Sequence, residues 1–199
     1  MTPIEALLGR HSLGGKHLAE PGPDVAQLRV MAEAALHAPD HAELVPFRFA
    51  IVRGAAREKL AALFAQAARD AGKDEAGAAL DADRARLPPL TAVVIARIDL
   101  GHPVVPAHEQ WAAVGGAITN FLNAAHAQGF AGKMLSGKKV RHPALIAAFC
   151  RPGETLVGWI ALGTPTRPIA SGHDKAQIED VLGDWSDQSS NAATSSSGA

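Results

Sequence analysis

Three consecutive residues near the amino terminus, Arg10, His11 and Ser12, have the chemistry of an anion site. They offer a guanidinium, an imidazole and a hydroxyl, and all three can donate hydrogen bonds to phosphate oxygens. They follow a short apolar stretch with helical spacing and precede the flexible pair Gly14 and Gly15. An arginine at a helix end also interacts favourably with the helix dipole, so this group alone leaves both interpretations open.

A second segment, residues 132–138, matches part of a phosphate-binding loop, with two glycines separated by four residues and followed by a lysine. Lys139 stands where such a loop needs a serine or threonine for magnesium, and a long helical pattern precedes the segment where a strand is required. The glycine fingerprint of a dinucleotide-binding Rossmann unit is absent. A nucleoside-triphosphate site is therefore disfavoured.

His37 and His41 are four residues apart, a spacing that resembles a pair of metal ligands. Pro39 lies between them and interrupts the helical turn, so the two imidazoles need not share a face. No second cluster supplies the remaining ligands convincingly. Polar contacts at a helix end are the favoured interpretation, and no metal is expected.

Composition narrows the class of protein. The chain has 199 residues and a net charge of −1, which argues against a nucleic-acid or membrane surface. We expect no signal peptide, because the first eight residues contain an early acid and no basic stretch, and no bilayer-spanning segment, because the apolar runs are too short. The only cysteine, Cys150, cannot form an internal disulfide, which predicts a cytoplasmic protein. No histidine is placed beside it by the sequence, so we expect an inert, at least partly buried thiol.

Helical periodicity, caps and breakers predict a chain in which helices dominate. Helices are expected at 4–8, 24–39, 55–70, 74–86, 107–128, 140–149 and 178–182. The second should bury a stripe made of Val25, Leu28, Met31, Ala35 and Leu36. The fifth carries small residues that permit close approach of another helix, and so should be central: Ala112, Ala113, Gly115, Gly116 and Ala117.

Strands are expected at 47–52, 90–98 and 155–162, and the second is a nearly continuous apolar run that predicts burial on both faces. The combination indicates an α+β or three-layer arrangement in a single domain over residues 1–185. Residues 186–199 lack apolar side chains that could offset the entropy of ordering, so a disordered tail is predicted there.

Five segments occur in an informative order. They are Arg-His-Ser at the end of 4–12, Ala-Ala-Leu-His-Ala-Pro-Asp-His at 34–41, Pro-Phe-Arg-Phe-Ala-Ile-Val at 46–52, the helix 115–130 that begins Gly-Gly-Ala-Ile-Thr-Asn, and Leu-Gly-Thr-Pro at 162–165. In this order they resemble the motifs of the nitroreductase family, specifically its short, compact branch. The resemblance covers about residues 4–168.

The resemblance implies an α+β, three-layer fold with a mostly antiparallel central sheet, and an obligate homodimer that shares FMN between its subunits. It implies that NADH or NADPH reduces the FMN and that no side chain is a catalytic acid. By position, the implied FMN-binding residues are Arg10, His11 and Ser12 at the phosphate and ribityl chain, His37 and His41 from the other subunit, and Met134, Leu135 and Ser136 along the flavin. The stretch 124–129 is implied for the nicotinamide nucleotide, and Arg167 as an extra phosphate ligand.

Four positions depart from the family pattern. Val45 replaces a glutamine, Phe47 replaces a tryptophan, and the aromatic residue and arginine common at Met134 and Leu135 are absent. The missing cation could change FMN affinity or redox potential unless His37 or Lys133 compensates.

The leading functional hypothesis is an oxidoreductase that reduces nitroaromatic or quinone-like small molecules by a ping-pong mechanism. The alternatives are a flavin-dependent relative with another reaction, dehalogenase-like or flavin-modifying, and a non-enzymatic flavin-binding dimer.

Overall fold

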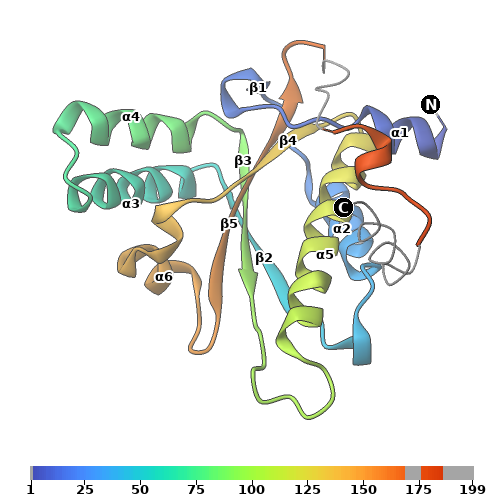
Figure 1. Ribbon diagram of the computed structural model, residues 1–199. Helices are drawn as coiled ribbons and strands as arrows, with labels where there is room; N and C mark the ends of the chain where they lie inside the picture. Colours follow the sequence, from blue (N-terminus) through green and yellow to red (C-terminus); the bar gives the residue numbers. More distant parts are fainter. Residues whose placement is uncertain (1, 169–175, 186–199) are drawn as a thin grey trace, which may run out of the picture.

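The computed structural model describes residues 2–168 and 176–185, and Figure 1 shows helices on both sides of one sheet. The predicted tail, 186–199, lies outside the described residues. The strands are β1 (Leu18–Ala19), β2 (Phe47–Arg53), β3 (Leu90–Ala96), β4 (Ala131–Leu135) and β5 (Thr155–Pro165). They follow the order β1–β5–β3–β2, and β4 also pairs with β5. All four strand pairs are antiparallel, so the predicted α+β, three-layer class is confirmed.

The helices are α1 (Pro3–Gly9), α2 (Val25–Leu36), α3 (Ala56–Asp70), α4 (Glu75–Arg86), α5 (Ala107–Ala127) and α6 (Pro143–Phe149), with short 3-10 turns η1 (Gly15–His17), η2 (His41–Glu43), η3 (Lys138–Arg141) and η4 (Ile178–Asp180). Helices α2 and α5 cover one face of the sheet, while α3, α4 and α6 lie on the other (Figure 1). Among the described residues, no helix is long and apolar enough to cross a membrane.

Strand β3 explains why the two helical layers share one sheet. Its residues are all buried, and alternate side chains enter opposite cores. Ala92 and Val94 pack in the cluster beneath α2 and α5, whereas Val93 and Ile95 pack in the cluster beneath α3 and α6. Since successive side chains of a strand point to opposite faces, a continuous apolar run is what such a central strand requires. The prediction of a strand buried on both faces is confirmed.

Helix α2 begins with the expected cap, in which Asp24 and Gln27 bond reciprocally to each other's backbone N–H groups. Its predicted buried stripe is partly wrong. Met31 and Ala35 are buried, but Val25 and Leu36 are 54% and 58% exposed. Helix α2 contacts α5 on one face only. Its apolar face is wider than this contact, so the apolar residues at its edges stay exposed.

Close packing of α2 on α5 depends on a small residue, as predicted. A Cβ atom at Gly116 would lie 3.1 Å from the Cβ of Ala38, just after α2. Two other expectations are wrong. Helix α6 begins at Pro143 rather than at Val140, because the residue before a proline, here His142, is restricted to an extended conformation. The short helix expected at 178–182 is a 3-10 turn at Ile178–Asp180. Strand β4 was not predicted, since its sequence Ala-Gly-Lys-Met-Leu shows no regular alternation.

Candidate functional site

The segment after α1 brings the predicted anion-binding residues to the start of β4. Ser12 forms an isolated parallel bridge with Gly132, and the Leu13 N–H donates to the Gly132 carbonyl at 3.1 Å. Leu13 is buried and anchors the segment, whereas Arg10 and His11 are half-buried and Ser12 is exposed. The contact with β4 therefore holds three hydrogen-bonding side chains at the surface beside one strand.

A third nitrogen base completes this group. His126, in the last turn of α5, lies against α1, where a Cβ atom on Gly9 would be 3.6 Å from its Nε2. Burial lowers the pKa of His126, and the nearby positive charges of Arg10 and His11 lower it further. Mutual repulsion among these groups would be relieved by an anion, which is the electrostatic environment that a phosphate group needs.

The predicted flavin-lining residues follow along the same strand. Leu135 lies opposite Trp159 of β5, and it is exposed, as is Ser136. Gly132 and Ser136 are four residues apart, which is about 13 Å along a strand. The structure thus brings Arg10, His11 and Ser12 to one end of β4, and Leu135 and Ser136 to the other.

A cavity of about 840 Å³ opens beside Leu135 and Ser136, between the Gly14–Lys16 loop and the α3–α4 hairpin. Its volume lies within the range of small-molecule and cofactor sites. Large apolar side chains that could pack against a flat ring line it: Leu60, Phe64, Leu87 and Trp159. Six cationic side chains also line it, against Asp70 and Asp81: Lys16, Lys73, Arg84, Lys138, Lys139 and Arg141. The cavity suits a planar, electron-rich or anionic ligand.

His37 and His41 lie elsewhere. The Nδ1 atom of His41 is 2.8 Å from a carboxylate oxygen of Glu109, in the first turn of α5. Glu109 and His126 are 17 positions apart, which is about 25 Å along a helix. Within one chain, His41 and the Arg10–Ser12 group, both predicted to contact a single flavin, therefore lie at opposite ends of α5. His37 precedes Ala38, which packs against Gly116 in the middle of that helix.

The loop that carries His41 has an unusual backbone. Ala42, Glu43 and Val45 have φ angles of 63°, 52° and 46°, in the left-handed region that non-glycine residues rarely adopt. A carboxylate oxygen of Asp40 accepts a hydrogen bond from the Val45 N–H at 2.6 Å, which holds the loop in this conformation. Val45, a departure from the family pattern, thus belongs to a strained loop.

Two other sequence predictions can be placed. Phe47 is 9% exposed and packs in the core, away from the cavity, so its departure from the family pattern does not alter the cavity wall. Cys150 is half-buried, and burial raises the pKa of its thiol, with Glu154 raising it further. The expected partial burial is confirmed, and a raised pKa disfavours the reactive thiolate form.

Sequence reasoning missed the Gly14–Lys16 loop and the α3–α4 hairpin as cavity walls. Lys16 had one available signal, since it follows two glycines directly after the anion-binding group. Arg84 and Asp81 had no such signal in the sequence. The same charges on a fully exposed helix would give the same sequence pattern. Three or more metal-ligating side chains do not converge anywhere in the part of the chain that the structure describes.

The chain belongs to the nitroreductase family, whose model matches residues 7–164. It is 36% identical over 170 residues to the Escherichia coli K12 protein named "Putative NAD(P)H nitroreductase YdjA", and the match covers 83% of this chain and 89% of that protein. The predicted resemblance is confirmed, and with it, at the level of the family, an FMN-dependent oxidoreductase of the nitroreductase type.

Solved structures share the fold. A nitroreductase-like family protein from Bacillus cereus superposes with a TM-score of 0.76 at 20% identity, covering 93% of this chain and 96% of that one. The FMN- and NADPH-dependent nitroreductase NfnB from Sphigopyxis sp. strain HMH gives a TM-score of 0.69 at 18% identity, covering 94% of this chain and all of that one. At these identities the likeness establishes the architecture alone.

Proposed function

We propose that this protein is a homodimeric oxidoreductase that passes electrons from NADH or NADPH, through FMN, to nitroaromatic or quinone-like acceptors in a ping-pong cycle. The proposal rests on the arrangement of two groups of residues at the two ends of β4. The predicted anion-binding residues Arg10, His11 and Ser12 lie at the start of this strand, and a large apolar cavity with cationic walls lies at its end. FMN has a phosphate at one end and a planar ring system at the other, so its two ends match the two ends of β4.

When bound, FMN supplies the hydride chemistry, and the chain binds and orients it. Arg10, His11 and Ser12 bind the phosphate and ribityl chain, because they are the cationic and hydroxyl donors beside Gly132. Leu135 and Ser136 flank the ring at the cavity, whereas Met134, the third residue predicted there, packs against the cluster beneath α2 and α5 on the opposite face of the sheet. Nicotinamide and acceptor use the same open face of the site in turn, which gives the ping-pong order. The cationic walls favour the added negative charge that accompanies reduction.

The homodimer is supported by the distance between the two groups of site residues. His41 contacts Glu109, about 25 Å along α5 from His126, which lies beside the anion-binding group, so His41 is too far away to contact the same ring. In a two-fold dimer His37 and His41 reach the site of the other subunit. Large apolar side chains stay exposed on α2 and α5 and are available for this contact: Val25, Val30, Leu36 and Trp111.

Subunit mixing tests this arrangement directly. Arg10→Met and His41→Ala each damage a different half of the shared site, so each variant alone should lose most nicotinamide-driven activity. Coexpressed at equal levels, half of the dimers contain one copy of each variant, and one of their two sites carries neither change. Activity should return to about a quarter of the wild-type level. No recovery in a mixture with proven heterodimers would contradict a shared site.

A visible absorption spectrum after incubation with FMN tests the cofactor. A protein without bound flavin refutes the proposal, and a monomer in sedimentation at micromolar concentration refutes the homodimer.

A second reaction class, dehalogenase-like or flavin-modifying, is favoured by one observation. Leu135 lines the cavity where the family commonly has a cation. Slow turnover of nitroaromatics by a protein whose flavin is readily reduced supports this alternative. A bound flavin that neither nicotinamide reduces indicates a non-enzymatic flavin-binding dimer. The lone cysteine supports a cytoplasmic location.

A further inference from the structure

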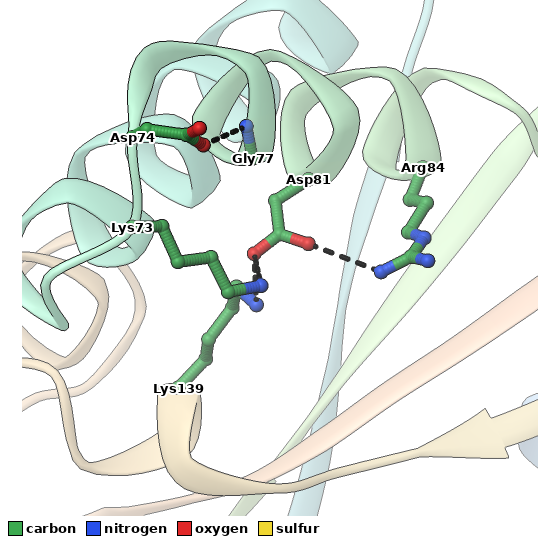
Figure 2. Close-up of polar contacts among 6 residues, drawn as sticks. All are labelled: Lys73, Asp74, Gly77, Asp81, Arg84 and Lys139. Carbon is green, nitrogen blue, oxygen red and sulfur yellow. Dashed lines mark hydrogen bonds and ion pairs between the residues drawn. The ribbon is translucent and has the colours of Figure 1, made fainter.

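Asp81 of α4 is a buried carboxylate in the cavity wall, only 2% exposed. Figure 2 shows it pointing between three cations. One of its oxygens, Oδ2, accepts hydrogen bonds from Lys73 Nζ at 2.9 Å and Lys139 Nζ at 2.8 Å, and Oδ1 lies 3.3 Å from Arg84 Nη1. Burial alone would raise the pKa of the Asp81 carboxyl, but the bonds from Lys139 and Lys73 outweigh it and lower the pKa. Asp81 is therefore ionised at neutral pH.

Lys139 connects two parts of the cavity wall that are far apart in the sequence. It belongs to η3, which follows β4, and its ammonium group lies 5.5 Å from the centre of the Phe64 ring of α3. His142, just after η3, adds a second link, with Nε2 2.9 Å from Oδ2 of Asp70. The segment after β4 is thus attached to both helices of the α3–α4 hairpin.

The attachment lies close to the flavin-lining residues. Lys139 is three residues after Ser136, and Gly137 between them has a φ of 128°, so the chain turns sharply there. Movement of Lys139 away from the hairpin would therefore change the position of Ser136 and widen the cavity.

Stability alone does not account for this buried charge. Removing a carboxylate from water is costly, and apolar replacements of buried ion pairs are often neutral or stabilising. The neighbouring buried residues of α4 are Ala78, Ala82 and Ala85, so a small apolar residue would suit the position. The Asp81 carboxylate is better explained by the positions in which it holds its cationic partners than by a contribution to stability.

We propose that Asp81 is a positioning residue of the flavin site, which holds Lys139 and so fixes the segment from Ser136 to Lys139 against the α3–α4 hairpin. It also keeps Lys73, Arg84 and Lys139 at the cavity wall, where their charges act on the ring. The inference rests on the proposed function. Asp81 thereby holds cations in the cavity wall that Leu135 also lines, where the family pattern places a positive charge.

The test compares Asp81→Asn, Lys139→Met and the double variant by FMN titration. Each single change should raise the Kd for FMN about tenfold, and the double variant should be no worse than either single one, because both remove the same contact. Lys139→Arg, which keeps the donor, should bind within about twofold of wild type. Multiplied effects in the double variant, or unchanged binding in both single variants, overturn the proposal.

The flavin midpoint potential separates positioning from general damage. In Asp81→Asn the released cations turn towards water. The affinity for reduced FMN should then fall about tenfold more than the affinity for oxidised FMN. For a two-electron couple this lowers the potential by about 30 mV. A raised potential would mean that the cations stay in place without the carboxylate, which overturns the proposal. If Asp81→Asn fails to fold, Lys139→Met provides the same two measurements.

The same hairpin offers a matched control. Arg69 and Glu75 form an ion pair at 2.6 Å, but both side chains are exposed and neither lines the cavity. Glu75→Gln should leave FMN affinity and potential unchanged, and an effect equal to that of Asp81→Asn overturns the proposal. Wild-type protein that binds no FMN refutes the proposed function instead, so the two failures are distinguishable.

Discussion

Glu154 should contribute stability that disappears in acid, and replacing it by glutamine isolates that contribution. Its side chain is 3% exposed and lies just before β5. It accepts hydrogen bonds from Arg48 Nε at 2.8 Å and Nη2 at 2.5 Å, and from the Arg151 N–H at 2.7 Å. Since Arg48 also donates to the Phe149 carbonyl, the pair connects the edge strand β2 to the turn between α6 and β5.

The magnitude follows from the pKa. Hydrogen bonding from Arg48 lowers the pKa of Glu154 from 4.5 to about 2, despite the opposing effect of burial. Each pH unit of such a difference corresponds to about 1.4 kcal/mol, so the ionised carboxylate contributes at most about 3 kcal/mol. Arg48 is about one third exposed, and solvent screening reduces the expected contribution to about 2 kcal/mol.

The pH window follows from the direction of the change. Because the folded-state pKa lies below the unfolded value, the contribution is complete above pH 4.5 and is lost as the pH falls towards 2. Urea unfolding at several pH values between about 7 and 2.5 should show wild type more stable than Glu154→Gln by about 2 kcal/mol at neutral pH. The difference should shrink steadily below pH 4.5.

Two results would refute this reasoning. A difference that persists undiminished at pH 2.5 would mean that glutamine disturbs packing rather than charge. Equal stabilities at neutral pH would mean that the pair is effectively solvated. Glu58→Gln is the control, because Glu58 pairs with Arg86 while 65% exposed, and such surface pairs contribute at most about 1 kcal/mol.

Three further changes have expected outcomes. Gly132→Ala should lower the free energy of unfolding, measured in urea, by about 2 kcal/mol or more, because the new Cβ would lie 2.7 Å from the Ala161 carbonyl oxygen. The control is Gly115→Ala, which should be neutral or stabilising because no atom lies close to that position. Gln110→Leu should cost about 2–3 kcal/mol and speed hydrogen exchange at Asp99, since the buried amide bonds to Asp99 and to the Val105 carbonyl. Arg10→Met should raise the Kd for FMN at least tenfold but leave riboflavin affinity nearly unchanged, because the lost contact is with the phosphate; equal losses for both ligands would place Arg10 elsewhere.

Most helices and the fold class could be predicted from the sequence, because local patterns specify them. The cap of α2, for example, depends on residues only three positions apart. The apolar run of β3 identifies a central strand without knowledge of its neighbours. The predicted anion-binding group is likewise a local pattern, since its three residues are consecutive.

Strand β4 could not be predicted, because its extended conformation is stabilised by pairing with β5, about thirty residues later in the chain. The exposure of Val25 and Leu36 could not be predicted either. Periodicity identifies the apolar face of a helix, but not how much of that face a neighbouring helix covers.

The family, and the prediction that Arg10, His11 and Ser12 bind an anion, therefore follow from the sequence alone. Only the tertiary structure decided which residues join them. It placed Leu135 and Ser136 at the far end of β4 and separated His41 from the group by the length of α5. It also brought Lys139 to Asp81, 58 positions away in the sequence. Contacts of this kind depend on strand register and helix packing, which arise from the whole core and leave no local pattern in the chain.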